Sequence, residues 1–277
     1  MMNFETPSPS ADPTLHKPRI LCLHGGGTNA RIFRAQCRVL ERSLSSKFRF
    51  CYAEAPFPSK PGPDVVSVYK GCGPFKAWLR WSPEDPHRDA TSAIERIQCS
   101  LLGAMTEDDE KGATGEWVGL LGFSQGAKIC ASLLYMQQFS RDVFGIDTDW
   151  PQFRFAVLLA GRGPLVSLMP DMPIPHGLVA ASAVTTTVVE ERLRFPFLDL
   201  TRIPTIHYHG LKDPNIHLHR RLLHDYFDKR YVRVQEWEGG HRVPIKTKDV
   251  NRLVEEIIDM AIQSRALSQF ECDYFNI

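Results

Sequence analysis

The sequence predicts an α/β protein with a mostly parallel sheet that helices cover on both faces. Two observations predict this class. Short apolar segments of strand length alternate along the chain with longer segments that have a helical period. Several of the apolar segments, such as those at 117–121 and 153–160, are largely apolar on both faces, which is typical of parallel strands buried in a doubly covered sheet. We therefore expect one domain over residues 18–266, between a disordered tail at 1–17 and a C-terminal tail at 267–277.

The individual elements follow from these patterns. Strands are expected at about 18–24, 48–54, 117–121, 153–160, 203–210 and 231–237, and helices at about 30–43, 88–106, 127–136 and 246–266. The last helix carries Val250, Leu253 and Ile257 on one face and charged residues on the other, as an outer helix packed on a sheet does. The acidic segment Thr106–Gly112 is expected to be a solvated turn, because nothing nearby supplies further metal ligands.

Two long segments, about 55–87 and 162–200, interrupt this alternation and are expected to be irregular insertions. Loops of this length in a compact domain are usually functional or disordered. Both are rich in Pro and apolar residues, so we expect them to form an acyl pocket and a lid. Aromatic residues that could line this pocket, or form a satellite core instead, are Phe57, Tyr69, Phe75, Trp78, Trp81 and Phe197.

The pentapeptide Gly122–Gly126 has the form G-x-S-x-G. It lies between a predicted strand and a predicted helix, which is the context that a nucleophile elbow requires. A serine on such a sharp turn presents its hydroxyl to an open cleft. Because a neutral hydroxyl is a poor nucleophile, Ser124 needs a base that accepts its proton. The motif therefore predicts a histidine and an acid further along the chain.

A histidine and an aspartate follow Ser124 in the order expected of an α/β-hydrolase. His241 stands on a loop just past the strand at 231–237, and Asp213 stands in the loop after the preceding strand. Loops at the carboxyl ends of parallel strands meet at one edge of the sheet, where active sites are usually built. We therefore predict a triad of Ser124, Asp213 and His241. Asp199 is the alternative acid, although it precedes its strand instead of following it.

Backbone N–H groups for an oxyanion hole are predicted from two segments. The first strand is followed by a histidine and three glycines, His24–Gly27, an HGGG-type loop that supplies one donor in esterases and lipases. We assign this donor to Gly26 and the second to Gln125, the residue after the serine. Gly27 is the alternative to Gly26, by a shift of one residue.

A group of histidines near the predicted acid suggests a metal site. Its members are His207, His209, His217, His219 and His224. Metal sites need three or four converging ligands with defined spacing, and this group does not show one. We therefore predict no metal site and no cofactor.

Composition argues against several other classes. Basic and acidic residues are interspersed, with a formal net charge of +1, which indicates neither a nucleic-acid-binding surface nor a polybasic membrane anchor. No apolar run approaches the roughly 20 residues that span a bilayer, and the N-terminus lacks the pattern of a secretory signal. The seven cysteines lack C-x-x-C spacing, and several lie in apolar segments. A reducing, cytoplasmic location is therefore expected.

Several of these segments resemble the fungal serine hydrolases of the FSH type. They are Leu21–Gly27, Glu54–Pro58, Gly122–Gly126, Ile203–His207 with Gly210–Asp213, and Glu238–Pro244. The similarity covers about residues 18–262. The family includes the thioesterase that releases the polyketide of the lovastatin pathway and related hydrolases of fungal polyketide clusters. The resemblance implies the triad named above, an α/β-hydrolase fold, an intracellular enzyme and no cofactor.

We therefore expect a serine hydrolase that cleaves an acyl thioester of a polyketide or fatty acyl chain. The substrate would be presented by an acyl carrier protein of a polyketide synthase. A carboxylesterase for small esters, and an acyltransferase or cyclase, remain alternatives because they use the same triad. A binding protein that lost turnover is the alternative from another class, and the complete triad argues against it.

Overall fold

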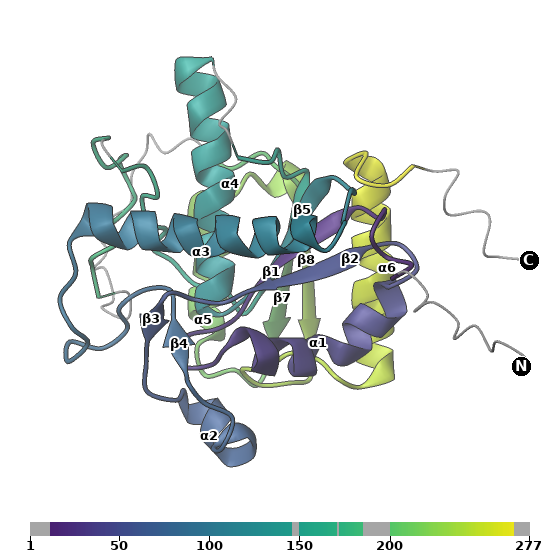
Figure 1. Cartoon of the computed structure of the whole chain (residues 1–277), viewed down its shortest axis with the longest axis horizontal. Coiled ribbons are helices and arrows are strands. Elements are labelled where there is room, and N and C mark those ends of the chain that lie inside the picture. Colours follow the sequence, from purple (N-terminus) through teal and green to yellow (C-terminus); the bar gives the residue numbers. More distant parts are fainter. Residues whose placement is uncertain (1–11, 146–149, 171, 185–199, 269–277) are drawn as a thin grey trace, which may run out of the picture.

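A computed structural model describes residues 12–145, 150–170, 172–184 and 200–268 of the chain. Six strands in this part form one parallel sheet in the order β2-β1-β5-β6-β7-β8 (Figure 1). They are β1 (Arg19–Leu23), β2 (Arg49–Ala53), β5 (Trp117–Phe123), β6 (Phe155–Leu159), β7 (Thr205–Gly210) and β8 (Val232–Trp237). The six strands expected from the sequence are all present, and every pairing in this sheet is parallel.

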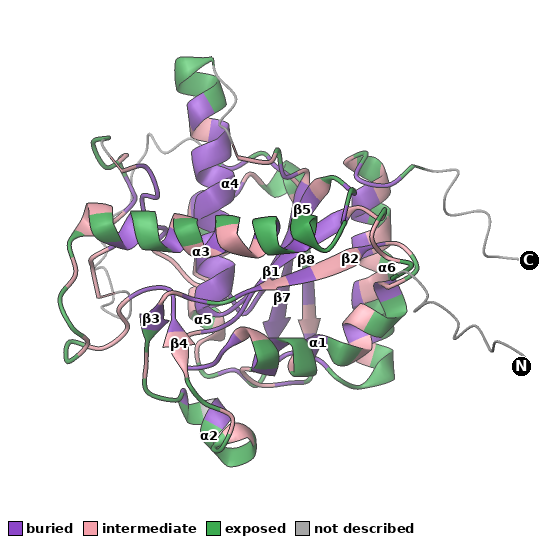
Figure 2. Ribbon diagram, viewed as in Figure 1, coloured by how far each residue is buried: buried purple, intermediate pink, exposed green. Residues whose placement is uncertain are grey.

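Helices cover both faces of this sheet (Figure 1). The buried hydrophobic residues form two clusters, one on each face of the sheet. One cluster includes residues of α1 (Ala30–Leu44) and α6 (Thr247–Gln263), and the other includes residues of α3 (Ala90–Glu110), α4 (Gln125–Phe144) and α5 (Ile216–Tyr226). The alternation of side chains along a strand produces the two clusters. In β1, Ile20 and Cys22 belong to the cluster of α1 and α6, whereas Leu21 and Leu23 belong to the other. Figure 2 shows that α4 is buried along most of its length.

Side-chain caps define where two of the helices begin. The side chain of Asn29 accepts a hydrogen bond from the Ile32 amide at 2.8 Å, and the side chain of Asp89 accepts one from the Ser92 amide at 2.9 Å. Each bond satisfies an amide that has no partner inside its helix. The acidic residues after Thr106 do not form the solvated turn that the sequence suggested, because α3 continues through Glu110.

Asp108 shows why the acidic segment stays in the helix. Its side chain is 6% exposed and accepts hydrogen bonds from Arg49, with Nη2 of the arginine 2.8 Å from Oδ1. The guanidinium of Arg19 lies 3.5 Å from its other oxygen. Two arginines from the strands β1 and β2 therefore neutralise a buried carboxylate on α3. This ion-pair cluster fixes the C-terminal end of α3 against the edge of the sheet.

The segment at 55–87 is more regular than expected. It contains the short helix α2 (Pro63–Tyr69), and its strand β3 (Phe57–Pro58) pairs antiparallel with β4 (Lys76–Ala77). A 3-10 turn, η2 (Lys229–Tyr231), precedes β8. Of the segment at 162–200, residues 185–199 lie outside the described part of the chain, and so does Phe197.

The tails also differ in part from the expectation. Residues 12–17 are not disordered: the Thr114 amide donates to the Leu15 carbonyl at 2.8 Å, and the Lys17 ammonium donates to the Ser45 carbonyl at 2.8 Å. Leu267 is buried at the other end of the chain. Residues 1–11 and 269–277 lie outside the described part. Within that part, no helix combines the length and the apolar character needed to cross a membrane.

Candidate active site

The parallel sheet brings four distant segments to one edge. Gly25–Gly27 follow β1, Ser124 follows β5, Asp213 lies just past β7, and His241 lies just past β8. All four strands run in the same direction, so their carboxyl ends share this edge. The strand order therefore explains why residues more than a hundred positions apart in sequence meet.

Ser124 occupies a strained turn between β5 and α4. Its backbone has φ of 53° and ψ of −111°, a positive φ that a residue with a side chain rarely adopts. The two glycines of the motif make this turn possible. A Cβ at Gly122 would lie 2.5 Å from the Cα of Ala127, and a Cβ at Gly126 would overlap the Leu23 carbonyl oxygen. Only glycine allows α4 to start so close to β1 and β5, which is the geometry of a nucleophile elbow.

The three residues of the predicted triad form a continuous hydrogen-bonded chain. The Oγ of Ser124 lies 3.0 Å from Nε2 of His241, and Nδ1 of His241 lies 2.6 Å from Oδ2 of Asp213. The carboxylate can only accept, so Nδ1 of His241 donates to it. This tautomer leaves Nε2 free to accept the proton of the serine hydroxyl.

Asp213 is held as a carboxylate by its neighbours. Burial works to raise the pKa of Asp213, but hydrogen bonds from His241, the Asn215 amide and His219 outweigh it and hold the pKa well below its usual range. The Asn215 amide donates to Oδ1 at 2.9 Å. Asp213 is therefore ionised throughout the neutral pH range and can balance a positive charge that develops on His241.

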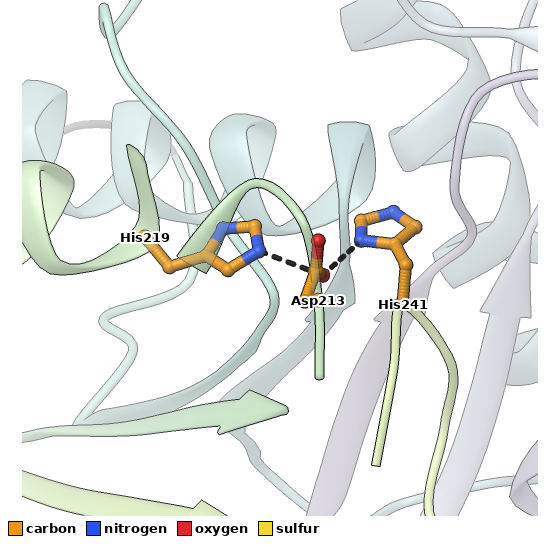
Figure 3. Close-up of side chains that lie close together, drawn as sticks. All are labelled: Asp213, His219 and His241. Carbon is orange, nitrogen blue, oxygen red and sulfur yellow. Dashed lines mark hydrogen bonds and ion pairs between the residues drawn. The ribbon is translucent and has the colours of Figure 1, made fainter. Parts of the chain in front are cut away.

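His219 is a member of this site that the sequence pattern did not place there. Figure 3 shows His219 and His241 on opposite sides of the Asp213 carboxylate. The Nε2 of His219 lies 2.9 Å from Oδ2 of Asp213, and its Nδ1 lies 2.9 Å from the Gly161 carbonyl oxygen. The His219 side chain has no exposed surface. Asp213 is thus fixed from two sides, and the sequence signal for this contact is a histidine six positions after the acid, in the first turn of α5.

We expect His219 to be a positioning residue for Asp213. His219→Phe keeps a ring of similar size but removes the donor, and it should lower kcat by about tenfold to a hundredfold, since a hydrogen bond to a charged group is worth about 1.5–3 kcal/mol. His219→Gln retains an N–H that can reach the carboxylate and should restore most of the loss. Steady-state kinetics with a nitrophenyl ester, and melting temperatures of both variants, test this. Equal losses of kcat in the two variants would indicate a purely structural role.

The other histidines of the suspected cluster lie elsewhere. His207 and His209 are buried on β7, where burial lowers their pKa values to about 3 and about 4. His217 and His224 are exposed. Among the described residues, the one group with converging ligand atoms is Asp213, His219 and His241. Their separations of 2.6 and 2.9 Å are those of hydrogen bonds, so the described contacts account for this group without an ion. The absence of a cofactor stays a prediction.

The backbone favours Gly26 over Gly27 as the first oxyanion donor. The amide of Gly27 donates to the Lys76 carbonyl at 2.9 Å and is therefore engaged. Gln125 is the first residue of α4, where backbone amides have no partner inside the helix. The Gln125 side chain lies against Gly26, because a Cβ built there would be 3.1 Å from its Oε1. The assignment of both donors stays a prediction.

Polar side chains hold the loops around the predicted oxyanion hole. The Oε1 of Gln125 accepts from the Trp78 amide at 2.7 Å, and its Nε2 donates to the Leu79 carbonyl at 3.0 Å. The Nε2 of His24 lies 3.0 Å from the Ala55 amide, and its Nδ1 lies 2.8 Å from the Gly25 carbonyl. Through these contacts His24 holds its glycine loop against the segment that follows β2.

A cavity of about 510 Å³ opens onto Ser124 and His241. Its apolar lining comes from Val65, Trp81 and Phe123. The sequence left open whether five further aromatic residues line this cavity or form a satellite core, and four of the five lie in the described part of the chain. Phe57 and Trp78 are buried in the core, the indole N–H of Trp78 donates to the His24 carbonyl at 2.9 Å, and neither Tyr69 nor Phe75 is among the described lining residues.

A parallel sheet under helices, with a serine, a histidine and a carboxylate linked at its edge, defines a serine hydrolase of the α/β-hydrolase class. The serine hydrolase family FSH1 matches residues 13–253, so the chain belongs to this family. The esterase pigG of Monascus ruber is 56% identical over 266 residues, which cover 94% of this chain and 97% of that protein. The esterase dbaE of Emericella nidulans is 54% identical over 277 residues, which cover 97% and 100%. The chain is therefore a hydrolase of the esterase type.

Solved structures of other esterases share the fold. A carboxylesterase from Mesorhizobium loti matches with a TM-score of 0.50 over 90% of this chain and 92% of its own, at 17% identity. The acyl-protein thioesterase 2 of Zea mays gives a TM-score of 0.50 over 90% and 95%, also at 17% identity. At such identity the likeness concerns the fold alone, and it confirms the α/β-hydrolase architecture.

Proposed function

We propose that this protein is a serine thioesterase that hydrolyses an acyl thioester through a Ser124–His241–Asp213 triad. The observation that carries the proposal is the chain of hydrogen bonds from Ser124 Oγ to His241 at 3.0 Å and from His241 to Asp213 at 2.6 Å, beside a cavity. The acyl group is a polyketide or fatty acyl chain. An acyl carrier protein of a polyketide synthase presents it.

The first half of the reaction acylates the serine. Ser124 Oγ attacks the acyl carbonyl carbon while Nε2 of His241 takes the hydroxyl proton. The carboxylate of Asp213 stabilises the imidazolium that forms. The tetrahedral oxyanion is stabilised by the amides of Gly26 and Gln125, and each such donor is worth about 3–4 kcal/mol in known serine hydrolases. His241 then gives its proton to the leaving sulfur, and the carbon–sulfur bond breaks.

The second half returns the free enzyme. Water attacks the acyl group on Ser124, and His241 again accepts a proton. The same two amides stabilise the second oxyanion. Collapse of this intermediate releases the carboxylic acid and returns the proton from His241 to Ser124 Oγ. No step requires a group other than these residues and water.

The substrate class rests on the cavity and on the sequence resemblance. A volume of about 510 Å³ lies within the usual range of ligand pockets, and its walls include Val65 and Trp81. The resemblance to polyketide-releasing thioesterases supports a thioester of a long acyl chain. The cysteines in the described part of the chain are free thiols, which supports a reducing compartment such as the cytoplasm.

An acyl chain buried in this cavity should make the enzyme sensitive to chain length. Each buried methylene contributes about 0.8 kcal/mol, so three or four should raise kcat/KM by roughly a hundredfold if the burial is realised in the transition state. We would measure kcat/KM on acyl thioesters from acetyl to dodecanoyl. Val65→Ala should flatten the slope, because Val65 is 7% exposed and lines the cavity.

Val68→Ala is the matched control on the same helix, since Val68 is 72% exposed. It should keep the wild-type slope. A wild-type profile that is flat with chain length would contradict the long-chain thioesterase and favour a carboxylesterase for small esters. An acyl product joined to an added alcohol, instead of the free acid, would favour an acyltransferase.

A further inference from the structure

The charged side chains among the described residues that line the active-site cavity are lysines and arginines. Its described lining includes four cationic side chains and no aspartate or glutamate; the cations belong to Lys128, Arg162, Lys212 and Arg242. Lys212 and Arg242 are exposed, and Lys212 pairs with Glu238 at 3.3 Å. Water screens charges of this kind, so their contribution to binding is small. Lys128 and Arg162 lie deeper and set the charge of the inner wall.

Lys128 stands one helical turn after the nucleophile. Its backbone amide donates to the Ser124 carbonyl at 3.2 Å, so the two residues share the first turn of α4. Lys128 is 2% exposed, and its Nζ donates to the Gly163 carbonyl at 3.3 Å. This bond places the ammonium group beside the loop that carries Arg162. An ammonium group this deeply buried is uncommon in proteins.

Arg162 faces the same space from the end of β6. It is half-buried, and within the described residues its guanidinium makes no hydrogen bond or ion pair. Burial and the charge of Arg162 lower the pKa of Lys128 to about 7. The charge of Arg162 therefore disfavours the charge of Lys128, whereas the nearby Asp213 carboxylate favours the charge of Arg162 against the effect of burial. A bound anion would offset the repulsion between Lys128 and Arg162. It could also accept hydrogen bonds from the N–H groups of the guanidinium.

We propose that Lys128 and Arg162 form a subsite for an oxyanion of the substrate, either a carboxylate on the acyl group or a phosphate on the leaving group. This inference rests on the proposed hydrolase function and adds the charge of its substrate. A guanidinium can bind two oxygens of a carboxylate or phosphate at once, and an ammonium adds a point charge. Their place beside Ser124 lets one substrate occupy the subsite and the triad together.

Matched pairs of substrates separate the two sources of the oxyanion. The first pair is the nitrophenyl hydrogen ester of adipic acid and its methyl ester, which differ by a carboxylate on the acyl side. The second pair is hexanoyl coenzyme A and hexanoyl N-acetylcysteamine, which differ by phosphates on the leaving group. In one of the pairs, Arg162→Gln and Lys128→Met should each lower the ratio of kcat/KM for the anionic over the neutral substrate by about tenfold to a hundredfold. The pair that responds identifies the source.

Arg38→Gln is the control, because it removes the same charge from an exposed position on α1. It should leave both ratios unchanged. If Lys128→Met does not fold, Arg162→Gln decides alone. Ratios that stay at the wild-type value in both pairs would overturn the subsite. Wild-type enzyme that hydrolyses none of the four substrates would instead contradict the proposed function, so the two failures are distinguishable.

Discussion

Ser124→Ala should lower kcat by roughly 10⁴- to 10⁶-fold, the scale seen when the nucleophile of a triad is removed. The reason is geometric. The Oγ of Ser124 is the group within 3.0 Å of Nε2 of His241, and without it the acyl-enzyme cannot form. Alanine keeps the Cβ that the elbow already accommodates, so the fold should be retained. We would measure kcat on an acyl thioester and confirm the fold by circular dichroism.

Labelling with a fluorophosphonate gives a second measurement of the same change. The wild-type protein should bind one equivalent of the probe, and Ser124→Ala should bind none. Ser100→Ala, on α3 and away from the cavity, should label as the wild type does. Activity of Ser124→Ala within tenfold of the wild type would reject Ser124 as the nucleophile.

The strands and the sheet class were predictable because their signals are local. The apolar runs that became β5 and β6 differ from helices in length and in period, and the structure begins and ends them within two residues of the expected positions. The ends of α3 were less predictable. In the sequence, the carboxylates at its C-terminal end are typical of a solvated turn. Asp108 can be buried in the helix because Arg19 and Arg49, from strands distant in the sequence, form ion pairs with it.

The candidate triad was predictable because its chemistry needs particular residue types in a particular order on particular loops. The pocket was not, because side chains on a long loop give no sign of the direction in which they point. Trp78 and Trp81 are three residues apart, yet the first is in the core and the second lines the cavity. The neighbouring strands β3 and β4 are two residues long, and strands so short have no recognisable period in the sequence.

The contacts that His219 and Arg162 make were not predictable for a different reason. Each is an ordinary polar residue in the sequence, and each matters through a neighbour that the fold supplies. His219 meets Asp213 because α5 starts three residues after the acid. Arg162 meets Lys128 because the end of β6 lies beside the first turn of α4. Such contacts follow from tertiary structure and have no sequence spacing of their own.

Asp213→Asn should lower kcat by about 10⁴-fold and leave the fold intact. Asp213 accepts hydrogen bonds at 2.6 Å from His241 and at 2.9 Å from His219. Both histidines contact Oδ2, whereas Oδ1 accepts from the Asn215 amide, so the N–H₂ group of an asparagine faces either the two histidines or another donor, the Asn215 amide. If it faces His241, the imidazole takes the tautomer that carries its proton on Nε2 and can no longer accept the proton of Ser124. The variant also has no charge to balance the imidazolium.

The measurement is kcat on an acyl thioester across the neutral pH range. Because the pKa of Asp213 is held well below its usual range, the wild-type carboxylate is ionised at every pH in that range, so a large loss should be present throughout. Asp199→Asn makes the same chemical change at the alternative acid and should keep activity near the wild-type value. If Asp199→Asn were the crippling change and Asp213→Asn the mild one, the acid would be Asp199. The hydrogen bonds of Asp213 to two histidines would then serve structure alone, and the melting temperature of Asp213→Asn would fall without a matching loss of kcat.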